Sequence, residues 1–392
     1  MALAILGMRG SGSYSTNVER PQSWREAILL LFPNGKAPLT AIMSKLSSEP
    51  VDDPIFHWFE KDVPVQRVAT TASVGAAVTT LTIADSSIFR AGHVIMEEVT
   101  LEKMLVVSDP TSATQINVQR AFGTTAAASV TSGDNLLIIG NANAEGASSA
   151  NVISYSPTTP SNNTQIFRNS LYLTRTAMKT RLRTGNSREE AKRETLELHS
   201  IEMEKAAIFG EPFSSTGANG QPMLTTGGVV SFLGADATFT NITDFSSTTF
   251  NIANWENALE NFFKYGASEK LLLAGSTFIN QLNQLVKKSS VMNLVPGDTS
   301  YGMKIREYET PFGTLYVKMH PLLSIHPTFK SWGLGLDVSK LRFRYIDDTD
   351  FRPNIQMPDM DAQKDEFLTE WGLELQHQKA HALYKNVTTF VA

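Results

Sequence analysis

Two histidines near the end of the chain have a spacing that could bind a metal ion. His377 and His381 lie four positions apart, and on an α-helix this spacing places two imidazoles on one face, as zinc sites require. The segment 370–387, however, carries Leu373 and Leu375 in the alternation typical of a strand. Residues four apart on a strand are separated by about 13 Å. We therefore expect structural histidines and no metal site.

Five aspartates precede these histidines and could bind calcium through carboxylate oxygens. They are Asp347, Asp348, Asp350, Asp359 and Asp361. The run lacks the central glycine and the terminal glutamate of an EF-hand loop. A solvated acidic loop over 347–366 is the simpler interpretation.

A small basic cluster and an aromatic segment are candidates for contact with nucleic acid. Lys179, Arg181 and Arg183 could contact phosphates, but glutamates follow from Glu189 onward, and we expect local ion pairing. The segment around Trp58 is dense in aromatic residues, and we interpret it as core and not as a base-stacking platform.

Catalytic motifs do not occur in the sequence. It contains no GxSxG elbow, no GxxxxGK[ST] phosphate loop, no GxGxxG after an expected strand, and no HExxH. The sequence therefore predicts no catalytic residue, no cofactor and no enzymatic activity. An enzyme with a β-rich accessory domain stays open as an alternative without a motif to support it.

Composition sets broad limits on the class of protein. The 392 residues suggest two or three domains. The formal net charge of -5 disfavours tight duplex binding. The sequence contains no cysteine, which excludes disulfides and thiol catalysis. No run approaches the ~18 apolar residues of a membrane span. We expect a soluble protein made in a cytosol.

The segment 187–209 predicts one long helix. Ser187 and Glu190 have the spacing of a capping box, and Gly210 is a helix-terminating residue. At about 1.5 Å per residue the helix is a rod of about 34 Å. Its predicted apolar stripe consists of Leu198, Ile201 and Ile208, with Leu196 and Met203 on its flank. Because the stripe is narrow, we expect one line of contact and a largely charged remaining surface.

A β-rich module is predicted over about 70–141. Five short β runs, at 79–83, 93–98, 103–108, 115–121 and 135–140, alternate with turn signals. Their spacing of roughly ten residues is typical of a small barrel or sandwich. A strand is expected at 55–68 before the module, and a polar linker at 142–165 after it.

The other segments combine helices and strands. A strand pair is expected at 165–181, a long loop at 210–230, and strands at 343–347 and 370–387. From 252 the pattern is mixed α/β. It predicts helices at 252–266 and 276–288, a buried strand at 270–275 and a hairpin at 303–323 that turns at 311–313. Short helices are expected at 23–32 and 38–46. Residues 1–20 are predicted to be an arm that is ordered by a neighbouring copy and is not removed.

Several short motifs resemble one protein family. They are Thr164-Gln165-Ile166-Phe167, the helix end from Glu202 to Gly210, Ile88-Phe89-Arg90-Ala91-Gly92, and Gln119 to Thr125. Together with the order of elements, they resemble the tailed-bacteriophage major capsid proteins of the Hong Kong 97-type fold, in a subfamily with a β-rich insert in the extended loop. The resemblance implies an α+β fold in which the long helix lies across a β-sheet.

The resemblance also implies a division into domains. Residues 1–54 would be an N-terminal arm with short helices, and 55–170 an extended loop carrying the insert at about 70–141. A peripheral domain would combine 171–250 with 331–392 and contain the spine helix 187–209. The axial domain would be 251–330.

The function implied is that of a structural subunit of an icosahedral virion shell around double-stranded DNA, assembled in the bacterial host cytoplasm. The implied partners are many copies of the chain in hexamers and pentamers, a portal protein, a scaffold or decoration protein where one is used, and packaged DNA through weak non-specific contact; no membrane is implied. Alternatives are another virion protein of the tail or decoration type, and an encapsulin-like compartment.

Two further expectations concern the shell. We expect it to be held without covalent crosslinks, since no Lys and Asn pair stands out in the sequence. We also expect an inner surface of mixed or negative charge, because a continuous basic lining containing Arg181, Arg183 and Arg188 would bind the polymer and hinder its entry.

Overall fold

The computed structural model describes residues 48–148, 150–180, 186–234, 241–288, 294–300 and 303–391. The chain divides into two compact units, Phe59–Pro160 and a second unit made of Met1–Trp58 with Ser161–Ala392. The predicted arm 1–20 and the predicted helices at 23–32 and 38–46 lie outside the described residues.

The unit Phe59–Pro160 is a small antiparallel barrel. Its six strands have the order β3-β8-β5-β6-β7-β4, and the ends of this sheet meet through a bridge between Thr70 and Ile83. The strands are β3 Arg67–Ala69, β4 Thr80–Thr82, β5 His93–Glu97, β6 Lys103–Val106, β7 Gln115–Gln119 and β8 Asn135–Asn141. The five runs predicted from alternation are therefore confirmed as strands. Every second side chain, such as Leu81, Ile95 and Ile116, fills the barrel interior.

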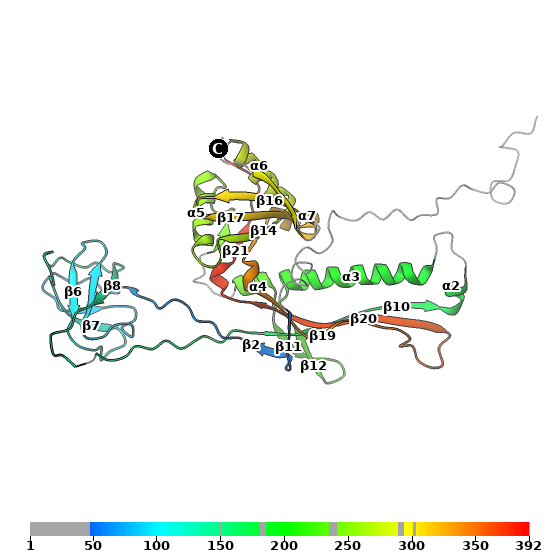
Figure 1. Cartoon of the computed structure of the whole chain (residues 1–392), viewed down its shortest axis with the longest axis horizontal. Helices are drawn as coiled ribbons and strands as arrows, with labels where there is room; N and C mark the ends of the chain where they lie inside the picture. Colours follow the sequence, from blue (N-terminus) through cyan, green and yellow to red (C-terminus); the bar gives the residue numbers. More distant parts are fainter. Residues whose placement is uncertain are drawn as a thin grey trace, which may run out of the picture. The chain divides into compact units, whose positions relative to one another are not determined.

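A four-stranded sheet supports the long helix in the second unit. Its order is β1-β19-β20-β10, from β1 Ser48–Pro50, β19 Leu341–Arg352, β20 Ala362–Leu375 and β10 Gln165–Thr174. Figure 1 shows the helix α3 Ser187–Phe209 running alongside β10 and β20. The prediction of a strand pair at 165–181 is wrong, because β10 is one strand and the short helix α2 Arg175–Lys179 follows it.

A seven-stranded mixed sheet forms the rest of this unit, with the order β13-β21-β18-β14-β17-β16-β15. Its strands are β13 Ile242–Asp244, β14 Glu269–Ala274, β15 Leu294–Ser300, β16 Met303–Thr310, β17 Gly313–Met319, β18 Gly333–Leu336 and β21 Ala382–Lys385. The helices α5 Ile252–Phe263, α6 Ser276–Lys288 and α7 Pro321–Ile325 accompany it. The hairpin predicted at 303–323 is confirmed by the pairing of Thr310 with Gly313.

Both faces of β14 are covered, which explains its continuous apolar sequence. Leu272 and Ala274 pack in a core with α5 and α6. Leu271 and Leu273 pack in a second core, which also contains Met203 of α3 and residues of the four-stranded sheet. A strand buried on both faces needs no polar alternation.

Two predictions about irregular segments are wrong. The segment 210–230 is not a loop, because it contains the hairpin of β11 Phe213–Thr216 with β12 Pro222–Thr225, and then α4 Val229–Gly234 begins. The segment 55–68 is not one strand. Within this segment the paired strands are β2 Ile55–His57 and the start of β3. β2 pairs with β9 Ser161–Asn163. The predicted α+β class is confirmed. Within the described ranges, no helix has both the length and the apolarity to cross a bilayer.

Candidate assembly site

The helix α3 has the predicted bounds, but its ends are built differently from the prediction. The N-cap is Asn186, whose side chain accepts a hydrogen bond from the Arg188 N–H, and Ser187 is the first helical residue. Gly210 has a φ of -55° and not the left-handed conformation we expected. Glycine is required there by close packing, because a Cβ would collide with the carbonyl oxygens of Thr226 and Ala206.

The buried face of α3 shares only Ile208 with the predicted stripe, and Met203 from its predicted flank. Leu198 is 58% exposed. The face that packs on the unit consists of His199, Met203, Glu204, Ala207 and Ile208. Burying polar side chains costs free energy unless they are hydrogen-bonded. The two polar members of this face therefore need partners on the facing elements.

Polar anchors join α3 to the sheet strands β10 and β20. His199 lies with Nδ1 2.6 Å from Asn169 Oδ1 and Nε2 2.7 Å from Thr369 Oγ1. Burial lowers the pKa of His199, which favours the neutral imidazole. Near the start of the helix, Arg188 Nη2 donates to Asp365 Oδ2 at 2.8 Å. Asp365 and Thr369 lie four apart on one face of β20, so two points on α3 are fixed to one strand face.

Burial and hydrogen bonds act in opposite directions on Asp365. Burial alone would raise the pKa of this carboxyl, but hydrogen bonds from the Asn354 N–H, Arg188 and Gln363 outweigh it and leave the pKa below its usual range. The carboxylate is thus held ionised beside the guanidinium of Arg188. The predicted basic cluster does not include Arg188, and Arg181 and Arg183 lie outside the described residues. Lys179 is the last residue of α2.

A second anchor joins α3 to the mixed sheet. His320 Nε2 lies 2.7 Å from Glu204 Oε1, and both side chains are 0% exposed. His320 is also the N-cap of α7. The pair thus links the C-terminal part of α3 to the turn that follows β17.

The two histidines with metal-ligand spacing lie at the two ends of the short 3-10 helix η4 Gln378–Ala380. The segment 370–387 is not one strand, because β20 ends at Leu375 and His377 has a left-handed φ of 52° before β21. His381 is fully buried and accepts from the Asp337 N–H through Nδ1. Burial lowers the pKa of His381 to about 4. Among the described residues no group of three or more His, Asp or Glu side chains has the arrangement of a metal site.

The aspartates of the predicted acidic loop lie partly on a strand. Asp347, Asp348 and Asp350 belong to β19, and only Asp359 and Asp361 lie in the connection to β20, so the prediction of a loop over 347–366 is wrong. Arg352 contacts Asp347 and Asp350 at 3.3 and 3.4 Å. Arg175 contacts Asp361 at 2.6 Å. Three of the five carboxylates, those of Asp347, Asp350 and Asp361, are thus paired with arginines.

A buried lysine is the strongest polar feature that the sequence reasoning missed. Lys270 Nζ donates to the carbonyl oxygens of Phe262, Tyr265 and Ala380 at 2.5, 2.6 and 2.9 Å. It closes the C-terminal end of α5, where carbonyl groups lack helical partners. Burial lowers its pKa to about 8. The only signal in the sequence is a lysine that opens an otherwise apolar run.

The sequence of this chain matches one protein-family model over most of its length. The family model described as SU10 major capsid protein matches residues 10–388 of this chain. The chain belongs to this family. A curated relative named "Major capsid protein" from Pseudomonas phage PaMx41 is 28% identical over 338 residues, which are 83% of this chain and 79% of the relative. The chain is therefore a structural phage capsid subunit and a component of the virion, and the tail, decoration and encapsulin alternatives are not favoured.

Two solved phage structures match this chain over nearly its whole length at low identity. A structure of Mycobacterium phage Cain is 10% identical, with 98% of this chain and 99% of that chain covered, at a TM-score of 0.49. The capsid of Myoviridae phage XM1 is 10% identical, with 97% and 99% covered, at a TM-score of 0.45. The Hong Kong 97-type prediction is confirmed by family membership together with the observed long helix, supporting sheet, mixed α/β unit and β-rich excursion.

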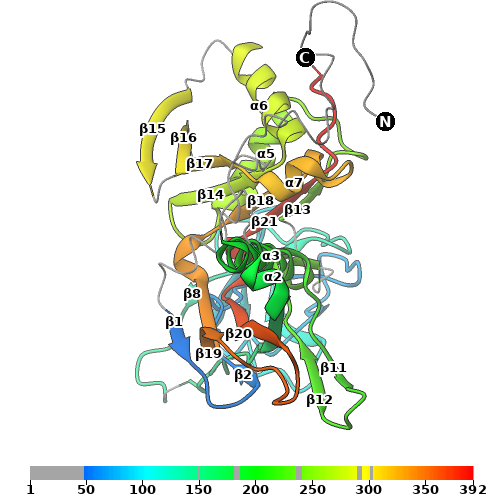
Figure 2. The same cartoon turned by 90° about the vertical axis from the view of Figure 1, so that its right-hand side faces the viewer.

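A capsid subunit acts through surfaces, and the described residues of the second unit include an apolar one. On the hairpin β11–β12, Phe213 is 63% and Met223 55% exposed, and the register places both on one face. Figure 2 shows this hairpin as a separate projection of the unit. Exposed large apolar side chains that gather on one face are typical of protein interfaces.

Proposed function

We propose that this capsid subunit assembles as hexamers and pentamers into a closed icosahedral shell around double-stranded DNA, in the cytoplasm of a bacterial host. The observation that carries the proposal is the match to the capsid family over residues 10–388. Portal protein, a scaffold or decoration protein, and packaged DNA in weak contact are proposed as further partners. The role is structural and non-enzymatic.

The domain roles belong to the same proposal. Residues 55–170 act as the extended loop with its insert, 171–250 and 331–392 as the peripheral domain, 251–330 as the axial domain, and 1–54 as the arm. The peripheral role of α3 is supported by its anchors on β10 and β20. The mixed sheet takes β13, β18 and β21 from outside 251–330, so these strands join the axial domain to the peripheral one.

The arm is proposed to hold neighbouring copies together. Residues 1–20 are rich in Gly, Ser and small residues and carry too little apolar surface to order themselves. In a closed shell each copy gives and receives the same contacts, so many weak interfaces add up to one stable particle.

Deletion of residues 1–20 tests the proposal. The truncated subunit should keep its circular dichroism and thermal melting in the unassembled state, while the yield of closed particles seen by electron microscopy falls sharply. The matched control is the full-length chain under identical conditions. If the full-length chain stays monomeric at every concentration, or if the truncated chain gives normal and equally stable particles, the corresponding part of the proposal is wrong.

A further inference from the structure

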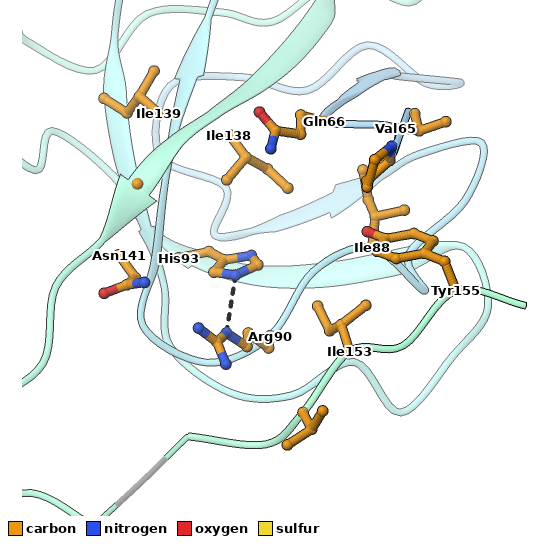
Figure 3. Close-up of a pocket in the computed structure, with 13 residues that line it drawn as sticks. Val65, Gln66, Ile88, Arg90, His93, Ile138, Ile139, Asn141, Ile153 and Tyr155 are labelled. Carbon is orange, nitrogen blue, oxygen red and sulfur yellow. Dashed lines mark hydrogen bonds between the residues drawn. The ribbon is translucent and has the colours of Figure 1, made fainter. Parts of the chain in front are cut away.

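The barrel unit carries an apolar pocket on its outer surface. It encloses about 540 Å³, within the range of about 300–1,000 Å³ that is usual for ligand sites. Figure 3 shows how Ile138 and Ile153 point into it beside His93 and Arg90. Aliphatic and aromatic side chains dominate the rim, and Val152 there is 88% exposed. The pocket is therefore open to an incoming molecule.

His93 offers this pocket an unused hydrogen-bond donor. Arg90 Nε donates to His93 Nε2 at 3.0 Å, so the proton of the neutral imidazole sits on Nδ1. Burial, and then the charge of Arg90, lower the pKa of His93 and favour this neutral form. The side chain is 8% exposed, and its Nδ1 has no partner among the described residues. Buried donors of this kind are usually paired with an acceptor from protein or ordered water.

The lining defines the chemistry of the occupant. Aliphatic walls select aliphatic side chains, and the Nδ1–H selects a carbonyl oxygen. An extended peptide with small aliphatic residues supplies both, because its backbone carbonyls are not used in a helix or a ladder. A second contact of Arg90, from Nη1 to the Asn151 carbonyl at 2.7 Å, holds the chain beside Val152 at the rim.

We propose that this pocket binds residues 2–6 of a second copy of the chain. This run, Ala-Leu-Ala-Ile-Leu, is apolar at all five positions and carries no charge. The 47 residues before Ser48 span up to about 150 Å when extended, at about 3.3 Å per residue. That reach exceeds the size of one subunit domain, so a neighbouring copy is accessible. The proposal rests on the proposed role of the arm and names its receptor.

The cysteine-free sequence allows a direct test. The double variant Leu6→Cys with Val152→Cys is assembled into particles, treated with a short bismaleimide, and analysed by denaturing electrophoresis. We expect dimers and higher multimers, because each copy would join its arm to the barrel of the next. The pair Ala4→Cys with Tyr155→Cys replaces it if the first variant does not assemble. The control pair, Leu6→Cys with Val107→Cys, places the second cysteine on an exposed barrel residue outside the pocket lining, and it should stay mostly monomeric.

Each other outcome contradicts the proposal. A crosslinked monomer of altered mobility would show that the arm occupies the pocket of its own copy. Equal multimers from the control pair would show unspecific collision, and no crosslink in intact particles would show that the pocket has another occupant. If deletion of residues 1–20 abolishes particles while the pocket pair does not crosslink, the role of the arm stands and only this receptor is wrong.

Discussion

The buried pair of Glu204 and His320 gives the sharpest test of how the long helix is fixed. Replacing His320 with leucine takes away the imidazole that lies 2.7 Å from the carboxyl oxygen of Glu204. The carboxyl stays fully buried. Removing one partner of a buried pair of this kind costs about 3–5 kcal/mol. The substitution also removes the N-cap of α7, which adds about 1 kcal/mol.

Replacing Glu204 with leucine has a smaller expected cost. It leaves the buried imidazole short of one partner, at about 1–3 kcal/mol. In the double variant, His320→Leu with Glu204→Leu, neither polar group remains. Its loss in the free energy of unfolding should therefore be at least about 2 kcal/mol smaller than the sum of the losses in the two single variants. The matched control is Glu194→Leu, the same substitution at an exposed position of the same helix, which should stay within about 0.5 kcal/mol.

Urea unfolding of the unassembled subunit measures these differences. The free energies of unfolding come from linear extrapolation, with unchanged m-values as the check that the unfolded state is comparable. Single losses below about 1 kcal/mol, or a double variant whose loss equals the sum of the single ones, would refute the view that this pair anchors α3.

Three further predictions concern charge, assembly and covalent structure. The pKa of Lys270 falls from 10.5 to about 8 on folding, so the folded state binds fewer protons than the unfolded state between these two pH values. The free energy of unfolding of the wild type, measured in urea relative to Lys270→Met, should therefore rise by about 3 kcal/mol as pH rises from 8 to 10.5. A difference between the two proteins that does not change with pH would contradict this. Replacing Phe213 and Met223 with serine should lower particle yield without changing the Tm of the unassembled subunit, whereas Ser214→Ala on the other face of the hairpin should change neither. Denaturing electrophoresis of particles should give one band at 43.0 kDa, and a ladder of multimers would reveal crosslinks.

The sequence by itself determined the features that depend on local periodicity. The helix 187–209 was predicted with its observed bounds, because a 3.6-residue pattern and terminal residues act within a few positions. The five barrel strands followed from alternation and turn residues in the same way. The order of elements and the short motifs were enough to predict the capsid family.

Only the tertiary structure decided which face of the helix is buried. The sequence offers apolar residues on more than one side of α3, and the predicted stripe combined Ile208, which is buried, with Leu198, which is exposed. The buried face also contains the polar side chains of His199 and Glu204. Their partners Thr369 and His320, however, lie 170 and 116 positions away. Hydrogen bonds to such distant residues offset the cost of burying polar groups, and no local pattern can reveal them.

The same reason explains the segment 370–387. The segment contains two strands, the end of β20 and the whole of β21, and these belong to two different sheets. His377, with its left-handed backbone, and the buried His381 lie between the two strands. The division depends on the positions of the partner strands, because β20 pairs with β19 and β21 pairs with β18. Periodicity in the sequence shows that apolar and polar side chains alternate along a segment. Which strand that segment pairs with depends on the assembled sheets.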